Sequence, residues 1–281
     1  MRDINFILKW GAGSCRYSDL RSIYFFTLLG LILFVSGCGK AGEAPTVTNA
    51  PSSESSTNVS SQKSVDLSTA GTLKGKVSFE GAAPAPKQIS VKGNPECAAL
   101  HPGGVIASEE LVVNNGALQN VFVYVKTGLE NYSFPVPQEA VTVENLKCTY
   151  VPHVSGVQVG QNVNFLNKDS TLHNIHSYPK ASKAFNLGLP LEGMKQVKKF
   201  DASEIMVPLK CDVHPWMLGY IGVLPHPYFS VSDSSGQFEL KGLPPGEYTI
   251  EAWHEKLGVQ SQKITLAAQE TKEIEFKFKA E

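Results

Sequence analysis

The sequence has little net charge and few of the residues that mark several common protein classes. Lys and Arg number 25 and Asp and Glu 26, so the chain carries a formal charge of −1. This balance argues against a nucleic-acid binder that works by neutralising phosphates. Five Cys in 281 residues are too few for a disulfide scaffold. The haem-attachment pattern Cys-x-x-Cys-His is absent.

Long amphipathic helical runs are also missing, and short alternating runs stand in their place. Apolar and polar residues alternate over residues 73–79 and 274–278, and valines recur at every second position of residues 121–125. Glycine-containing turn pairs, such as Asn115-Gly116 and Ser235-Gly236, separate such runs. Alternation with a period of two is typical of half-buried strands, so the sequence predicts an all-β protein.

The first 38 residues have the features of an export signal. Four basic residues precede an apolar run of 13 residues, Ile23–Val35, which suits a signal segment and is short for a membrane span. The run continues Ser36-Gly37-Cys38, which resembles the bacterial lipoprotein processing box. The resemblance implies an exported chain, on the periplasmic or cell-surface side, with a lipid anchor at Cys38. An ordinary secretory signal and an uncleaved anchor are the alternatives.

Residues 39–70 are predicted to be a disordered tether between this signal and the folded part. They contain eight Ser, four Thr and no aromatic residue. Such a composition cannot bury enough apolar surface to fold.

A set of metal-binding side chains lies in the middle of the chain. Cys211, His214 and Met217 form the pattern Cys-x₂-His-x₂-Met, and His173 lies upstream. One thiolate, two imidazoles and a weak thioether are the ligands of a blue-copper site. A single Cys predicts a mononuclear site and is a poor match to structural zinc. His176 is the alternative to His173 as the upstream ligand.

Around these ligands, residues 139–225 resemble a cupredoxin, and the ligand loop is most similar to that of amicyanin. The resemblance implies a Greek-key β-sandwich that holds one type 1 copper through His173, Cys211, His214 and Met217. It also implies that Asn174 ties the two ligand loops together by hydrogen bonds. His214 is then expected near the surface, within an apolar docking patch made by Pro215, Trp216 and Leu218.

The flanking segments, residues 71–138 and 226–281, carry a second resemblance. Asp233-Ser-Ser-Gly-Gln-Phe-Glu-Leu and Leu243-Pro-Pro-Gly-Glu-Tyr resemble the carboxypeptidase regulatory-like domain, a transthyretin-like β-sandwich. Gly75-Lys-Val-Ser-Phe-Glu-Gly resembles its first strand and turn. Either both segments form one sandwich with the cupredoxin part inserted, or two sandwiches follow one another.

The remaining Cys and His residues leave several interpretations open. Cys97 and Cys148 are predicted to form a disulfide in an oxidising compartment. They could instead join His101 and His153 in a second metal site, or remain free. His254 follows Trp253, and packing or capping is the simpler role for it.

These features together predict a membrane-tethered copper protein that carries single electrons between protein redox partners and is not an enzyme. A copper-delivery module and a scaffold without electron transfer are the alternatives. A multicopper enzyme would need further His clusters, and seven His spread along the chain do not supply them. The sequence does not identify the partners, the reduction potential or the oligomeric state.

Overall fold

The computed structural model describes residues 62–280, which form twenty strands and one six-residue helix, α1 (Pro95–Leu100). The protein is therefore all-β, as the alternating pattern predicts. These residues fall within one compact unit, Thr57–Glu281. No helix among them is long and apolar enough to cross a membrane. The predicted signal, Cys38 and most of the predicted tether lie outside the described residues.

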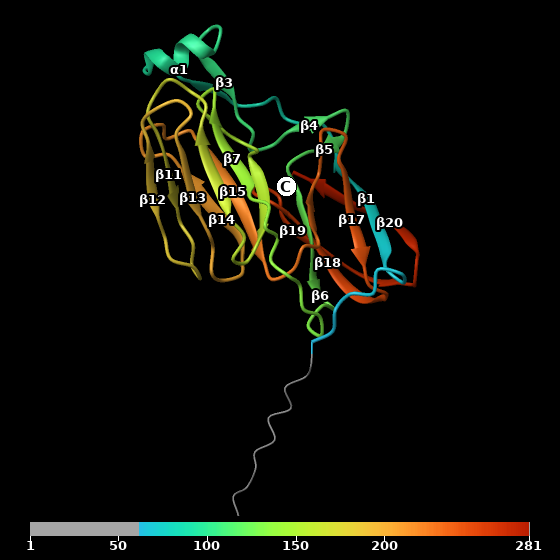
Figure 1. The fold of residues 1–281 in the computed structure, drawn as a ribbon. Coiled ribbons are helices and arrows are strands. Elements are labelled where there is room, and N and C mark those ends of the chain that lie inside the picture. Colours follow the sequence, from blue (N-terminus) through green and yellow to red (C-terminus); the bar gives the residue numbers. More distant parts are fainter. Residues whose placement is uncertain (1–61, 281) are drawn as a thin grey trace, which may run out of the picture. The chain divides into compact units, whose positions relative to one another are not determined.

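Two sheets combine strands from the beginning and the end of the described chain (Figure 1). In one, β1 pairs in parallel with β20 and antiparallel with β17; in the other, β6 pairs with β16 and β18. The two flanking segments thus share both sheets. The strands are β1 (Gly71–Glu80), β4 (Val113–Asn114), β5 (Ala117–Leu118), β17 (Gln237–Leu243), β20 (Thr271–Lys279), β6 (Phe122–Thr127), β16 (Phe229–Val231), β18 (Gly246–His254) and β19 (Gly258–Leu266).

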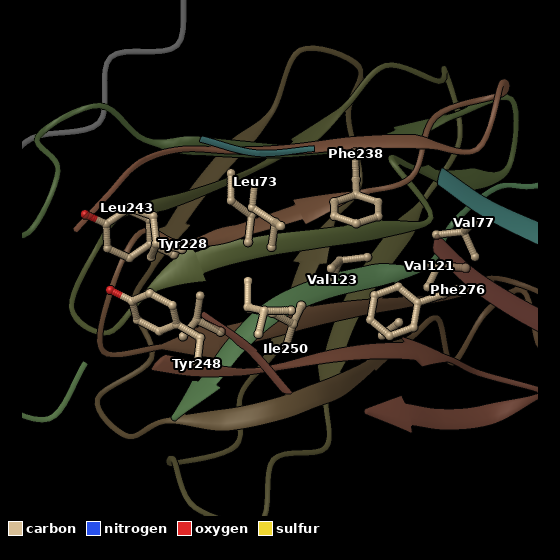
Figure 2. Packing of buried hydrophobic residues seen from close by; sticks show 14 of the residues in the cluster. Leu73, Val77, Val121, Val123, Tyr228, Phe238, Leu243, Tyr248, Ile250 and Phe276 are labelled. Carbon is tan, nitrogen blue, oxygen red and sulfur yellow. The ribbon is translucent and has the colours of Figure 1, made fainter. Parts of the chain in front are cut away.

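The core between these two sheets is built from the apolar members of the alternating runs. Figure 2 shows Leu73, Val77, Val123, Ile250 and Phe276 pointing toward one another, and each is fully buried. Burial of such side chains contributes about 1.5–3 kcal/mol each relative to exposure. In β1 and β20 the polar residues between them face outward, which explains the period of two in the sequence, whereas Phe122 and Tyr124 of β6 are buried on the opposite face.

The middle of the chain forms two further sheets, with strand orders β13-β10-β7-β8 and β12-β11-β14-β15-β9. A second core fills the space between them and contains Val143, Phe165, Ile175, Leu209 and Ile221. The strands are β7 (Val141–Leu146), β8 (Thr149–Val151), β9 (Val154–Gln158), β10 (Val163–Asn167), β11 (His173–Ser177), β12 (Asn186–Leu189), β13 (Lys195–Lys198), β14 (Glu204–Lys210) and β15 (Leu218–Leu224).

Two glycines allow strands of the middle sheets to approach strands of the two flanking segments. Gly156 of β9 pairs with Gly222 of β15. A Cβ at Gly156 would lie 2.4 Å from the ring of Phe229, and a Cβ at Gly222 would lie 2.5 Å from the ring of Phe122. Both aromatic rings therefore occupy space that any other residue at these two positions would fill.

The short helix lies beyond one end of the strands that carry the candidate site (Figure 1). It is flanked by β2 (Gln88–Ser90) and β3 (Val105–Ala107), which pair with each other. Asn94 caps its first turn by accepting a hydrogen bond from the Cys97 amide, and Pro95 begins the helix. A disulfide joins Cys97 to Cys148, so the helix is covalently attached to the middle sheets.

Residues 62–70 differ from the prediction of a tether that reaches residue 70. Lys63 forms a bridge with Tyr132 and exchanges backbone hydrogen bonds with Asn131 and Ser133. Asp66 then accepts hydrogen bonds from Ser68 in a turn that leads into β1. The polar composition of this segment does not reveal that it is ordered, because backbone hydrogen bonds rather than buried side chains hold it in place.

Candidate metal centre

Three side chains from two separate stretches converge at one end of the middle sheets. Nδ1 of His214 lies 3.0 Å from Nδ1 of His173 and 3.7 Å from Sγ of Cys211. One ligand atom from each residue lies within 4.8 Å of the others. The exposed fractions of the three residues are 0% for both histidines and 3% for Cys211. One sulfur and two imidazole nitrogens therefore face a common buried point.

The hairpin of β14 and β15 holds two of these residues in a short loop. Lys210 pairs with Leu218 where the strands meet the loop. Inside the loop, the Cys211 amide donates to Met217 O at 3.3 Å, and the Met217 amide donates to His214 O at 2.9 Å. Met217 is buried in the same core as Cys211. The loop thus brings Met217 back beside the residue that begins it.

His173 is oriented by a carboxylate that sequence reasoning did not assign to the site. Nε2 of His173 lies 2.9 Å from Oδ2 of Asp169. The same carboxylate accepts hydrogen bonds from the Lys147 amide at Oδ1 and from the Cys148 amide at Oδ2. Donation from Nε2 leaves Nδ1 of His173 without a proton, which is the form that binds a metal. The only signal in the sequence is the position of Asp169 four residues before His173.

The hydrogen bond between His173 and Asp169 raises the pKa of the imidazole and lowers the pKa of the carboxyl group. Burial acts to lower the pKa of His173, but the hydrogen bond and charge of Asp169, with those of Cys211, raise it overall. Burial acts to raise the pKa of Asp169, and the hydrogen bonds from His173, Cys148 and Lys147 outweigh it and lower that pKa. Asp169 is therefore an anion at neutral pH.

Cys211 is prepared for metal binding by its neighbours. Burial opposes its ionisation, but hydrogen bonds from His173 and His214, together with backbone hydrogen bonds of Asn174 and His214, lower the pKa of the thiol to about 6. The thiolate is the form that binds a metal, and at pH 7 it predominates.

Asn174 links the two ligand stretches by hydrogen bonds. Its Oδ1 accepts a hydrogen bond from the Asp212 amide at 2.7 Å and lies 3.2 Å from Sγ of Cys211. Its Nδ2 donates to the Asp212 carboxylate and to Asn186.

His176, the alternative ligand, instead places Nδ1 3.1 Å from the Asp212 carboxylate, so His173 is the residue that joins the cluster.

The prediction that His214 is the ligand ring nearest the surface is wrong, because His173 and His214 are equally buried. His214 is fully buried, and its Nε2 lies 2.9 Å from Nδ2 of Asn94. The predicted docking patch remains partly accessible, because Pro215 is exposed and Trp216 and Leu218 are half-buried. His214 is buried because the segment that contains α1 covers its ring. This segment precedes the cupredoxin-like range in the sequence.

The other Cys and His residues have separate environments. Cys97 and Cys148 form the disulfide, so they are not ligands in this state. Nε2 of His101 contacts Lys147 O at 2.7 Å, and His153 pairs with the carboxylate of Glu255. His254 is buried and accepts hydrogen bonds from the amides of the turn after β18, which is a capping role.

The donor set fits copper better than zinc. Structural zinc is usually enclosed by four tetrahedral ligands that include two or more thiolates. Here a single thiolate lies with two Nδ1 atoms, and the fourth candidate is the buried thioether of Met217. Two imidazoles, one thiolate and a weak thioether form the trigonal arrangement with an axial ligand that is typical of blue copper.

No protein-family model and no curated protein matches the chain. Structural neighbours include a Cu-containing nitrite reductase (NirK) from Thermus scotoductus SA-01, with 24% identity over 36% of this chain and a TM-score of 0.28. The match covers 25% of the reductase, so the matched part of this chain corresponds to only a quarter of that protein.

Two smaller neighbours are matched over most of their length. A purple cupredoxin from Nitrosopumilus maritimus is 26% identical over 30% of this chain and 98% of its own, with a TM-score of 0.26. An oxidised mutant of amicyanin is 24% identical over 30% of this chain and 81% of its own, with a TM-score of 0.27. At these TM-scores the function has to be inferred from the site itself.

Proposed function

We propose that this chain is a mononuclear blue copper protein that carries single electrons. The observation that supports this most directly is the convergence of the His173 and His214 Nδ1 atoms with the Cys211 sulfur in a buried cluster. Copper bound there would supply a one-electron couple between Cu(I) and Cu(II). His173, Cys211 and His214 would be the strong ligands, and the Met217 thioether would be a weak ligand that tunes the potential.

The surroundings of the ligands favour a site that keeps its shape. Asp169 holds His173, Asn174 holds the Cys211 loop, and Asn94 contacts His214. Such fixed ligands reduce the rearrangement that accompanies a change of oxidation state, which suits electron transfer. All three ligands are buried, so water is kept away from the thiolate.

The proposed context is a chain exported to the periplasmic or cell-surface side and held at a membrane by a lipid on Cys38. Its partners would be redox proteins, which meet through small and weak interfaces. The chain would transfer electrons without being a catalyst. Export and lipid attachment are tested by labelling cells with a palmitate analogue, with Cys38→Ala expected to abolish the label.

A copper-delivery protein would share these ligands but would release the metal. The two functions differ when the copper-loaded protein is oxidised and reduced repeatedly with small inorganic reagents and its copper content is then measured. An electron carrier retains its copper through many cycles. Progressive loss of copper during the cycles would contradict the proposal.

A further inference from the structure

The two histidines of the candidate site each contact a different side chain, and a disulfide connects the elements that hold these two side chains in place. On one side, Asn94 contacts Nε2 of His214 at 2.9 Å. On the other side, Asp169 contacts Nε2 of His173 at 2.9 Å. Asn94 caps the helix that contains Cys97, and the Cys148 amide donates to Asp169. The Cys97–Cys148 bond therefore links the segment that contacts His214 to the segment that holds the partner of His173.

The side-chain amide of Asn94 is oriented by the helix that it caps. Its Oδ1 accepts the Cys97 amide at 3.1 Å, so Nδ2 is the atom that faces His214. When Nε2 of His214 accepts this hydrogen bond, Nδ1 holds the proton of the neutral ring and donates to His173. An imidazole bound to a metal through Nδ1 carries its proton on Nε2 instead. In that form Nδ2 would face a donor, so the Asn94 side-chain amide would have to rotate and present its Oδ1 to the ring.

Two further contacts hold the helix and the loop of Cys148 against the ligand loop. Nε1 of Trp216 donates to Cys148 O at 3.1 Å, and the Trp216 and His214 ring centroids are 5.2 Å apart. His101, at the end of the helix, contacts Lys147 O. A ring nitrogen of His214 lies within 4.8 Å of both sulfurs of the disulfide. The His214 ring is thus enclosed on the side away from Cys211.

We propose that residues 91–104 form a cap over the metal site, that the Cys97–Cys148 disulfide fixes this cap, and that Asn94 is a positioning residue for His214. The cap restrains the ring and blocks the route by which a chelator or water would reach it. The proposal rests on the proposed function for the identity of the metal. The contact between Asn94 and His214 is a property of the protein alone.

Two substitutions separate capping of the helix from contact with His214. Asn94→Ala removes both contacts. Asn94→Ser keeps a residue that caps helices well but is too short to reach His214. Asn114→Ala is a matched control, because Asn114 is exposed and its side chain contacts Ser234 O. All three are compared with the wild-type full-length chain.

The first readout is the rate at which bathocuproine disulfonate removes Cu(I) from the loaded protein. Loss of a hydrogen-bond partner of a ligand weakens metal binding by roughly 10–100-fold. We expect removal to be about tenfold faster for both Asn94 variants and for the Cys97→Ser/Cys148→Ser double variant. Asn114→Ala should match the wild type. A Ser variant that releases copper at the wild-type rate would overturn the role of Asn94 as a positioning residue.

The second readout needs no metal. In the metal-free protein, ¹⁵N chemical shifts of the His214 ring report which nitrogen carries the proton. The contact predicts that Asn94→Ala and Asn94→Ser change these shifts, whereas Asn114→Ala leaves them unchanged. Unchanged shifts in both Asn94 variants would overturn the proposed cap whatever metal the site binds. A wild-type protein that binds no copper would instead refute the proposed function.

Discussion

Oδ2 of Asp169 lies 2.9 Å from Nε2 of His173, and the same carboxylate accepts hydrogen bonds from two consecutive amides, of Lys147 and Cys148. Both of these residues have left-handed backbone angles, with φ of 52° and 53°. The turn between β7 and β8 therefore aims its amides at the carboxylate. This arrangement fixes the proton of His173 on the nitrogen that is not used for the metal.

Replacing Asp169 by Asn should weaken copper binding by roughly 10–100-fold. The substituted amide has one acceptor oxygen for three donors and carries no charge to support the His173 ring. The measurement is a competition titration of Cu(I) against a chelator of known affinity. Asp201→Asn is the control, because Asp201 is exposed. Equal affinities for Asp169→Asn and the wild type would show that the carboxylate does not support the ligand.

His153 predicts a pH dependence of stability. Burial acts to lower its pKa, but the hydrogen bond and charge of Glu255, with the charge of Glu109, raise the pKa above the usual value of 6.5. A raised folded-state pKa means that the stabilisation is fully present below the pKa of the unfolded chain. It is lost as pH rises through the folded-state pKa.

The corresponding experiment compares the free energy of unfolding of the wild type and His153→Gln at pH 5.5 and at pH 9. The wild type should exceed the variant by more at pH 5.5 than at pH 9. Denaturant titrations of the metal-free proteins give both differences without interference from metal ligation. A difference that grows toward pH 9 would show that His153 is not held in its charged form.

The disulfide should also stabilise the metal-free fold. It closes a loop with a sequence separation of 51, for which the chain-entropy relation gives about 4 kcal/mol. Cys97→Ser/Cys148→Ser should lower the free energy of unfolding by an amount of that order in urea titrations without metal. A loss close to zero would mean that the surrounding contacts alone fix the helix.

Gly156 and Gly222 predict a steric effect at the contact between the middle sheets and the flanking sheets. An alanine at Gly222 would place its methyl group 2.5 Å from Phe122, and overpacking of this kind costs about 1–3 kcal/mol. Gly188→Ala is the control, because its Cβ would meet no atom within 4 Å. Thermal unfolding should show Gly222→Ala less stable than Gly188→Ala; the reverse order would contradict the packing described for Phe122.

The sequence predicts the strands and selects the candidate metal ligands because both signals are local. Alternation is visible within one strand, and Cys211, His214 and Met217 lie within seven residues of one another. The parallel pairing of β1 with β20 is not predictable in this way, since it joins Thr72 to Thr271. No periodic pattern reports which distant strand will be the neighbour.

The error about His214 has the same origin. Exposure of a ligand depends on what covers it, and the residue that contacts the ring, Asn94, is 120 positions away in the sequence. Asn94 followed by Pro95 predicts only the start of a helix. The disulfide between Cys97 and Cys148 could be anticipated from the expectation that the chain is exported to an oxidising compartment, but its position beside the ligands could not.

The most direct test of the proposed function is the visible absorption spectrum of the full-length chain loaded with one equivalent of Cu(II). A thiolate bound to Cu(II) gives intense charge-transfer absorption, so the wild type should be strongly coloured, Cys211→Ser colourless and Met217→Leu still coloured. Sγ of Cys211 lies 3.7 Å from Nδ1 of His214, which predicts that the thiolate is a ligand. A wild-type protein that binds Cu(II) with no more absorption than Cys211→Ser would contradict a blue-copper site.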